Sequence, residues 1–218
     1  MSSVESQQTS TGRRRNPRGQ GERLRAEILA AFARLLDQKV EENALPVSLR
    51  EVSREVGIAA QSMYLHFADK DELARAAVED GYERLVARLR DADAEAAAHG
   101  AGAPDRLRAQ ADAFYAFALA EKGLFRLMFG HDTSRFDTGG GAHPASLLWQ
   151  QWLNAVHACE REEGLRWPYG AEYAAIALWS ALFGRFALWT ATFGQHDPEA
   201  LTAFAHRMVD TVLREGRM

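Results

Sequence analysis

Two short helical segments joined by a short turn that begins with a glycine are the feature of this sequence that most restricts its fold. Ser48 and Glu51 have the spacing of a capping box, in which the serine side chain accepts from the third amide of a helix and the glutamate reaches back to the cap. Gly57 stands about two turns later, where a helix ends in a left-handed turn. The next segment, residues 60–67, has its two large apolar residues four apart on one helical face. The pattern predicts a helix-turn-helix unit.

The rest of the chain also shows the apolar spacing of helices. No segment alternates apolar and polar residues with β-branched enrichment, so we predict an all-α fold of about nine helices. Outside the unit, the predicted helices are 21–39, 70–98, 104–121, 124–129, 144–163, 169–193 and 198–215, and the Gly-rich segment 130–143 is a predicted loop. We predict three parts, namely a disordered basic arm (1–20), a helix-turn-helix domain (21–70) and a second helical domain (71–218).

Composition excludes several classes of protein. The 218 residues are 47% hydrophobic and 26% charged, which is typical of a globular chain and not of a disordered or collagen-like one. The single cysteine, Cys159, cannot form an internal disulfide. The first 20 residues hold no apolar stretch, so no signal peptide is predicted. Within the apolar segment 173–193, Arg185 would cost at least ~2.5–3.5 kcal/mol at mid-bilayer, which favours a buried helix and a cytoplasmic protein without membrane contact.

Positive charge is concentrated near the N-terminus. The net charge of −4 gives no general affinity for nucleic acid, so any contact with phosphates needs a local basic surface. Residues 13–25 hold six arginines against one glutamate, and the four that precede the first predicted helix are Arg13, Arg14, Arg15 and Arg18. This arm is predicted to bind phosphates or a minor groove, and a passive solvated tail is the alternative.

The sequence contains no pattern that indicates catalysis or metal binding. His157 and Cys159 are two residues apart and therefore do not share a helix face. His196, Asp197 and His206 do not complete a set of four ligands. There is no nucleophile–base motif and no phosphate-binding glycine motif. We predict no metal, no cofactor and no enzymatic activity.

The segment Ser48–Leu73, SLREVSREVGIAAQSMYLHFADKDEL, resembles the DNA-binding signature of the TetR family of bacterial repressors. That signature has a hydroxyl residue that opens the second helix, an Arg-Glu pair, a glycine–aliphatic turn, Tyr-x-His-Phe and a lysine that opens the fourth helix. The matching residues are Ser48, Arg50, Glu51, Gly57, Ile58, Tyr64, His66, Phe67 and Lys70, within a resemblance that covers residues 23–73. The chain departs from the pattern at Ala59, where a Ser or Thr cap is frequent, and at Ala60-Gln61, so no operator sequence is carried over.

The resemblance implies that the second helix of the unit enters the major groove of double-stranded DNA. The residues it implies for DNA contact are Ser48, Ala60, Gln61, Ser62, Tyr64, His66 and Lys70. A glutamine can form two hydrogen bonds with adenine, and a helix start favours a phosphate. On a helical wheel Gln61, Ser62 and Leu65 point outward. Partial packing against the first helix is the alternative for Tyr64 and His66.

The resemblance also implies that the C-terminal part binds a ligand. Bulky rings crowd this half, and an apolar cavity between helices is a natural ligand site. The pocket candidates are Phe114, Tyr115, Phe125, Met128, Trp149, Trp152, Trp179 and Phe183, with ordinary core or dimer contact as the alternative. Because charged residues are scarce there, we expect a small hydrophobic effector, and the possible polar handles are Arg126, Arg185, Tyr115 and His157. Residues 178–184 resemble a C-terminal subfamily marked by Trp-x-x-x-His-Gly, with Phe183 in place of the histidine.

A homodimer is predicted from segments 173–193 and 198–215. Their apolar residues have no obvious partners in a single chain, and two helices from each copy can close a four-helix interface. The predicted interface residues are Leu178, Leu182, Trp189, Leu201, Phe204 and Val212. A two-fold dimer predicts a palindromic operator.

Together these features predict a sequence-specific DNA-binding transcriptional regulator, a repressor that a small hydrophobic effector releases from its operator. The alternative is an all-α small-molecule-binding protein or enzyme that carries a helix-turn-helix-like unit without an operator.

Overall fold

The computed structural model describes residues 20–41, 47–130, 143–191 and 197–217. These residues form nine α-helices and no strand, which confirms the predicted all-α fold. The helices are α1 (Gln20–Glu41), α2 (Leu49–Val56), α3 (Ala60–Met63), α4 (Lys70–Ala98), α5 (Ala103–Ala120), α6 (Lys122–Phe129), α7 (Ala145–Glu163), α8 (Ala171–Ala191) and α9 (Pro198–Glu215). The predicted basic arm, with Arg13, Arg14, Arg15 and Arg18, lies outside the described residues, as does most of the Gly-rich segment.

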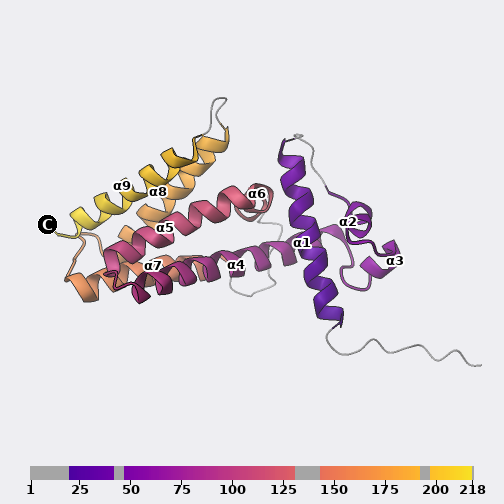
Figure 1. The fold of residues 1–218 in the computed structure, drawn as a ribbon, viewed down its shortest axis with the longest axis horizontal. Coiled ribbons are helices and arrows are strands. Elements are labelled where there is room, and N and C mark those ends of the chain that lie inside the picture. The colour runs from indigo at the N-terminus through magenta and orange to yellow at the C-terminus, as the bar shows by residue number, and fades with distance from the viewer. Residues whose placement is uncertain (1–19, 42–46, 131–142, 192–196, 218) are drawn as a thin grey trace, which may run out of the picture.

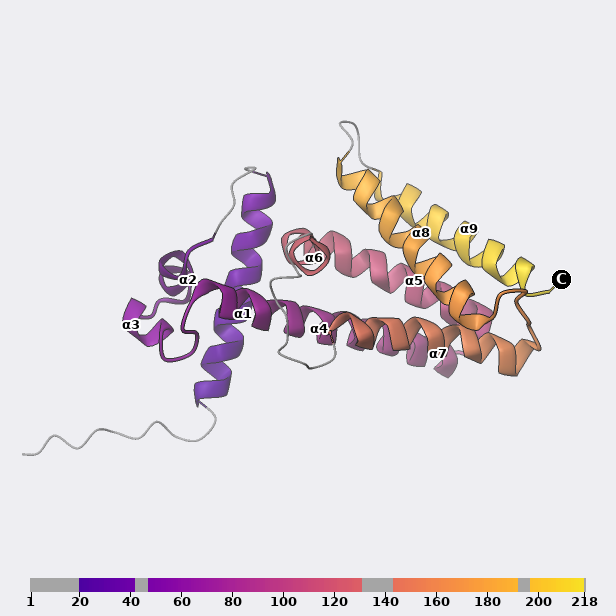
Figure 2. The same cartoon turned by 180° about the vertical axis from the view of Figure 1, so that it is seen from behind.

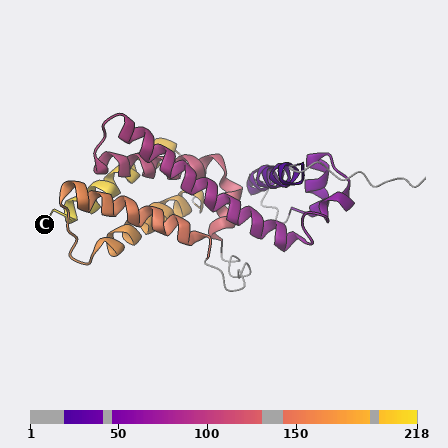
Figure 3. The same ribbon diagram turned by 90° about the horizontal axis from the view of Figure 1, so that it is seen from below.

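The helices form two groups that one long helix joins (Figures 1 and 2). Helices α1, α2 and α3 lie at one end of the molecule, and α5, α7, α8 and α9 lie at the other end. Seen from below, α4 runs continuously from the first group along the second (Figure 3). Helices α5 and α7 pack on α4, α8 packs on α7, and α9 packs on both α5 and α8. The short α6 packs on α1 as well as α4, so it connects the two groups.

The start of α4 is set by local hydrogen bonds. Asp69 is extended (φ −148°, ψ −178°) and its Oδ1 accepts from the Glu72 N–H at 2.7 Å. Glu72 in turn accepts from the Ala68 N–H at 2.7 Å. These contacts satisfy amides that the first turn leaves unpaired. The helix then runs over the predicted residues, 70–98, and buries one apolar seam.

Helix α3 is shorter than predicted. It ends at Met63, and residues 64–66 form a turn in place of the predicted continuation to Phe67. Its N-cap, Ala59, provides no side-chain hydrogen bond, so the helix lacks the stabilisation that a Ser or Thr would give. The Phe67 N–H still donates to the Met63 carbonyl at 3.0 Å, and both side chains remain fully buried.

The region between α5 and α6 also differs from the prediction. Lys122 and Gly123 were expected to end a helix, but they begin α6, and Glu121 alone separates the two helices. The Gly123 N–H donates to Asp37 Oδ1 of α1 at 2.5 Å. A Cβ on residue 123 would lie 2.3 Å from the Leu36 carbonyl carbon, so only glycine fits against α1 here. Burial raises the pKa of Asp37, although the Gly123 amide favours its charged form.

Candidate functional site

The capping box predicted at the start of α2 is confirmed. Ser48 is extended (φ −94°, ψ 155°), and its Oγ accepts from the Glu51 N–H at 3.2 Å. Glu51 Oε2 accepts from the Ser48 N–H at 2.7 Å, which completes the reciprocal pair. At the other end, Gly57 takes the left-handed conformation (φ 78°, ψ 28°) that reverses the chain toward α3. The backbone of the predicted helix-turn-helix is therefore present.

An ion pair fastens this unit to α1. Lys39 Nζ lies 2.6 Å from Glu51 Oε1, and neither side chain is more than one third exposed. The hydrogen bond from Lys39, followed by those from Ser48, lowers the pKa of Glu51 to about 2. Glu51 thus accepts a hydrogen bond in the cap of α2 and also forms the ion pair with α1.

We expect the contribution of Glu51 to stability to depend on pH. Its folded pKa of about 2 lies below the ordinary value of 4.5, so the contribution is complete above about pH 4.5 and is lost as the pH falls toward 2. Glu51→Gln keeps an oxygen that can accept from the Ser48 N–H but removes the charge that pairs with Lys39. It should therefore destabilise the protein at pH 7 by about 0.2–1 kcal/mol, and the difference should vanish near pH 2. Thermal unfolding between pH 7 and pH 2 measures it, with the exposed Glu79→Gln as the matched control. A difference that persists unchanged at pH 2 would contradict this assignment.

Helices α2 and α3 lie at one end of the molecule (Figure 1), and they or the residues next to them carry most of the residues predicted to read DNA. Gln61 is exposed on α3, Tyr64 is 55% exposed, and Ser62 is half-buried. Leu65 is 81% exposed, the highest value among the exposed large hydrophobic residues. A leucine displayed in this way beside a glutamine and a tyrosine gives the tip both polar and apolar contact groups. Ser48 and Ala60 are also exposed, and Lys70 is half-buried.

The backbone of His66 contacts a side chain of α1. The residue is half-buried, and its backbone carbonyl accepts from Arg25 Nη1 at 3.2 Å. The Arg25 guanidinium also lies 4.3 Å from the ring centroid of Phe67, a cation–π contact. Arg25 therefore has a structural role that holds the turn after α3, and DNA contact by the His66 ring stays a prediction.

Two cationic residues of α2 were missed by the sequence reasoning. Arg50 and Arg54 are exposed and four residues apart, and in the described part of the chain neither has an ion pair or a hydrogen bond from its guanidinium. The first helix of such a unit crosses the DNA backbone, where free guanidinium groups bind phosphates. The Arg-x-x-x-Arg spacing was the available signal, because it places both charges on one helix face.

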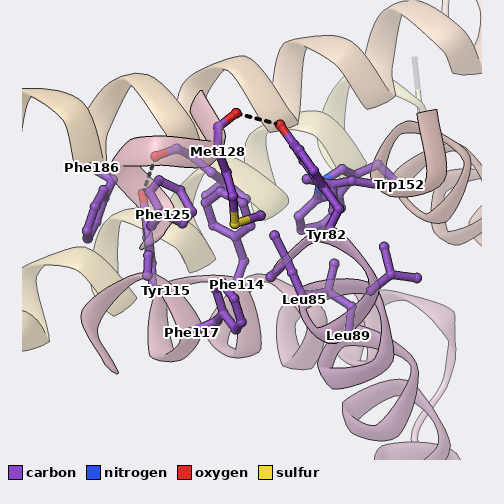
Figure 4. Close-up of a cluster of buried hydrophobic side chains, with 14 of the residues drawn as sticks. Tyr82, Leu85, Leu89, Phe114, Tyr115, Phe117, Phe125, Met128, Trp152 and Phe186 are labelled. Carbon is purple, nitrogen blue, oxygen red and sulfur yellow. Dashed lines mark hydrogen bonds between the residues drawn. The ribbon is translucent and has the colours of Figure 1, made fainter. Parts of the chain in front are cut away.

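Aromatic rings of α5, α6, α7 and α8 contact one another, and Figure 4 shows three of them, Phe114, Phe125 and Trp152, among the buried side chains. We define the ring cluster as these three residues together with Phe129, Trp179 and Phe183. The ring centroids of Trp152 and Phe114 are 5.9 Å apart, and those of Phe114 and Phe125 are 5.5 Å apart. Phe129 lies 4.5 Å from Phe125 and 6.4 Å from Trp179, again between centroids. Phe183 lies 5.0 Å from Phe129.

Most of the predicted pocket residues belong to this cluster or border it. Phe114, Tyr115, Phe125, Met128 and Trp152 are buried, whereas Trp149, Trp179 and Phe183 are half-buried. The Tyr115 hydroxyl donates to the Leu182 carbonyl at 3.0 Å, and the Tyr82 hydroxyl donates to the Met128 carbonyl at 3.1 Å. Burial raises the pKa of both tyrosines, so both stay neutral.

The predicted polar handles are engaged elsewhere or exposed. Arg126 is exposed on α6, and His157 Nδ1 lies 2.6 Å from Glu160 Oε2. The Arg185 guanidinium lies 5.9 Å from the ring centroid of Phe204 on α9. Only the Tyr115 hydroxyl borders the ring cluster, and it already donates to a backbone carbonyl.

The prediction that the dimer residues would be exposed in a single chain is wrong. Leu178, Leu182 and Leu201 are fully buried, Trp189 and Val212 are 8% and 7% exposed, and Phe204 is half-buried. The reason is that α5 and α7 cover the inner faces of α8 and α9. The apolar side chains that α8 does expose are Tyr173 (55%), Ile176 (40%) and Leu188 (62%). Gly184 lies on the same helix, and a Cβ there would meet no atom within 4 Å.

In the described ranges, no three His, Cys, Asp or Glu side chains gather as a metal ion would require. In the same part of the chain, no helix combines the length and the hydropathy needed to cross a membrane. Cys159 is buried, and desolvation raises the pKa of its thiol to about 11, so it stays an unreactive thiol at neutral pH.

Two sequence models of one family match the chain. Residues 28–77 match "Bacterial regulatory proteins, tetR family", and residues 107–212 match "Tetracyclin repressor-like, C-terminal domain". The chain is also 36% identical over 104 residues to an uncharacterised HTH-type transcriptional regulator from Haemophilus influenzae. That alignment covers 48% of the chain and about half, 47%, of the length of the relative.

Solved structures show the same fold. A protein of unknown function from a Rhodococcus species is 24% identical and superimposes with a TM-score of 0.70 over 94% of this chain and 100% of its own. The TetR family transcriptional regulator PfmR from Thermus thermophilus is 19% identical, with a TM-score of 0.62 over 86% of this chain and 97% of its own. These likenesses establish the arrangement of the helices.

Proposed function

The chain belongs to the TetR family of bacterial regulatory proteins, and from this premise we propose that it is a transcriptional repressor. It acts as a homodimer, binds a palindromic operator through its helix-turn-helix, and releases the operator when a small apolar effector binds between the helices of the C-terminal group. A bacterial regulator of this kind works in the cytoplasm, where the chromosome lies.

The tip formed by α2, α3 and the turn after α3 is the observation that carries this proposal. The left-handed Gly57 turns the chain from α2 into α3, and Gln61, Tyr64 and Leu65 on α3 and the turn after it are exposed. Glutamine amides and apolar side chains are groups that distinguish base edges in the major groove. The free guanidinium groups of α2 add affinity for the phosphates that flank that groove.

We propose that the dimer forms through the exposed face of α8 and not through the buried leucines that the sequence pattern indicates. Tyr173, Ile176 and Leu188 are exposed apolar residues on one helix, and Gly184 between them allows a second backbone to approach closely. A two-fold axis beside α8 would present two equivalent recognition tips, so the two half-sites would be related by the same axis.

Helix α6 offers a route by which an effector can change DNA binding. Its first turn is fixed to α1 by the Gly123–Asp37 hydrogen bond, and its later residues Phe125 and Phe129 belong to the ring cluster. Arg84 of α4 also holds Glu121 at the start of α6, with its Nη2 2.7 Å from Oε2. A ligand that displaces these rings would shift α6 and, through it, both α1 and α4. Coupling of this kind is typically worth about 1–3 kcal/mol and requires different ligand affinities for the two states.

The central experiment is selection of bound duplexes from a random pool, followed by fluorescence anisotropy on the selected operator. We expect Gln61→Ala to weaken binding by about 10- to 100-fold and to relax the base preference at one position in each half-site, because a bidentate base contact is worth ~1–3 kcal/mol. Gln150→Ala, at an exposed position of α7, is the matched control and should bind like wild type. Equal losses for the two variants would argue against base reading by Gln61.

The basic arm allows a separate test. Removal of residues 1–18 should lower the salt dependence of operator affinity if the four arginines bind phosphates. An unchanged salt slope would identify the arm as a passive tail. The alternative class, an all-α enzyme or carrier, predicts turnover or binding of a small molecule with no selected operator at all.

A further inference from the structure

The ring donors buried in the C-terminal group fall into two kinds. The hydroxyls of Tyr82 and Tyr115 and the indole N–H of Trp167 each donate to a backbone carbonyl, at 3.1, 3.0 and 2.8 Å. The indole N–H groups of Trp152 and Trp179 are also buried, but no protein group in the described part of the chain accepts from either. Trp152 is fully buried as a residue.

An unmatched buried donor is unusual, because more than nine in ten buried polar groups in proteins have a partner. Such a group loses its hydrogen bond to water on folding and gains nothing in exchange. The neighbouring tyrosines show that these helices do satisfy other ring donors. The indole N–H of Trp152 is therefore a donor to which the described part of the chain supplies no acceptor.

The two unmatched indoles stand at opposite ends of the ring cluster. Trp152 on α7 contacts Phe114, Trp179 on α8 contacts Phe129, and Phe125 lies between these two phenylalanines. The Trp152 end is fully buried, whereas Phe129, Trp179 and Phe183 are half-buried. A ligand that enters at the half-buried end can move these rings aside and reach the Trp152 side of the cluster.

The chemistry around the cluster selects a neutral ligand. None of its six side chains ionises, and the adjoining Tyr82 and Tyr115 are kept neutral by burial. Among the described residues, the cation that acts on Tyr115 is Arg185, whose guanidinium contacts Phe204 of α9. A carboxylate among these rings would lose its hydration without gaining a close positive partner, which is strongly unfavourable.

We propose that the effector is a neutral, largely apolar molecule with one oxygen acceptor, a carbonyl or an ether, that takes the hydrogen bond of the Trp152 indole N–H. This inference rests on the proposed function and narrows its effector class. Trp152 is then the residue that distinguishes an acceptor-bearing ligand from a plain hydrocarbon of the same shape.

The test compares 2-acetylnaphthalene, 2-ethylnaphthalene and 2-naphthoate on the full-length protein by calorimetric titration. Wild type should bind the ketone about 2- to 10-fold more tightly than the hydrocarbon, the range of one net hydrogen bond, and should bind the carboxylate most weakly. Trp152→Phe should lower the affinity for the ketone to that for the hydrocarbon and leave the affinity for the hydrocarbon unchanged. Trp167→Phe is the control, because the indole N–H of Trp167 already donates to the Val212 carbonyl. This variant should keep the wild-type ratio of ketone affinity to hydrocarbon affinity.

A direct readout uses the indole N–H signals in a ¹⁵N–¹H spectrum. The chain has five tryptophans, and the Trp152 signal is the one that Trp152→Phe removes. The ketone should move this signal downfield, and the hydrocarbon should not. This spectrum also keeps the proposal testable if Trp152→Phe is poorly folded, because Trp152 can then be assigned by elimination from the other four variants.

The outcomes separate this inference from the proposed function. If both naphthalenes bind and release the operator with equal affinity, the acceptor is irrelevant and the inference is overturned, while the effector model stands. If the carboxylate binds most tightly, the neutral class is wrong. If none of the probes binds, both the inference and the apolar-effector part of the proposed function fail, whereas operator binding remains a separate result.

Discussion

Gly123→Ala is expected to lower the melting temperature by about 6–12 °C. Its added Cβ would lie 2.3 Å from the Leu36 carbonyl carbon and 2.5 Å from the Asp37 amide nitrogen. Both are backbone atoms of α1, so no side-chain rotation can relieve the overlap. Overpacking of this kind costs about 1–3 kcal/mol or more, and for a chain of this size ~3 kcal/mol corresponds to that temperature change.

The same substitution should weaken operator binding, because α6 must move away from α1 and the 2.5 Å hydrogen bond between Gly123 and Asp37 must lengthen. Gly21→Ala is the matched control, since this glycine lies in α1 with no atom within 4 Å of the added Cβ. Its melting temperature should stay level or rise slightly, as alanine is the better helix former. Calorimetric unfolding and anisotropy measure the two effects. A Gly123→Ala variant as stable as the Gly21→Ala control would show that α6 and α1 are not in this contact.

Gly123 also illustrates what the sequence could not predict. In sequence it follows a helical pattern and looks like a helix stop, which is the local role glycine most often has. Its actual role depends on Asp37, 86 residues away, and on a close approach of two helices. No local pattern reports such a contact, so the boundary between α5 and α6 was misplaced by a few residues.

The features that the sequence did predict are those with local causes. The Ser48 cap and the Gly57 turn depend on side chains within a few residues of the backbone groups they satisfy. For the same reason the start of α4 was placed correctly from Asp69 and Glu72. Capping is short-range chemistry, and it survives whatever tertiary structure surrounds it.

Burial of the α8 and α9 leucines had no such local cause. Helix α8 is apolar on most of its circumference, so periodicity could not tell which side faces the chain's own core and which faces outward. Only the packing of α5 and α7 shows that Leu178 and Leu201 are covered. The same packing leaves other apolar residues of α8, Ile176 and Leu188 among them, exposed.

Leu188→Arg is expected to convert the proposed dimer into monomers. Ile176, Ser180, Gly184 and Leu188 follow each other at four-residue spacing, so they share one stripe of α8. In a two-fold interface each copy contributes the same surface, so one substitution places two arginines in an apolar contact. Light scattering coupled to size exclusion should give the mass of one chain for this variant and of two chains for wild type.

Operator affinity should fall together with dimerisation. A dimer binds its second half-site intramolecularly, which strengthens binding by ~10²–10⁴-fold over one half-site, and a monomer loses that gain. Leu147→Arg is the matched control, because Leu147 is a 44% exposed leucine of α7 outside the α8 stripe. It should remain dimeric and bind the operator like wild type. If Leu188→Arg is instead dimeric with full affinity while Leu147→Arg is monomeric, the interface lies on α7, and the two recognition tips are related by a different axis.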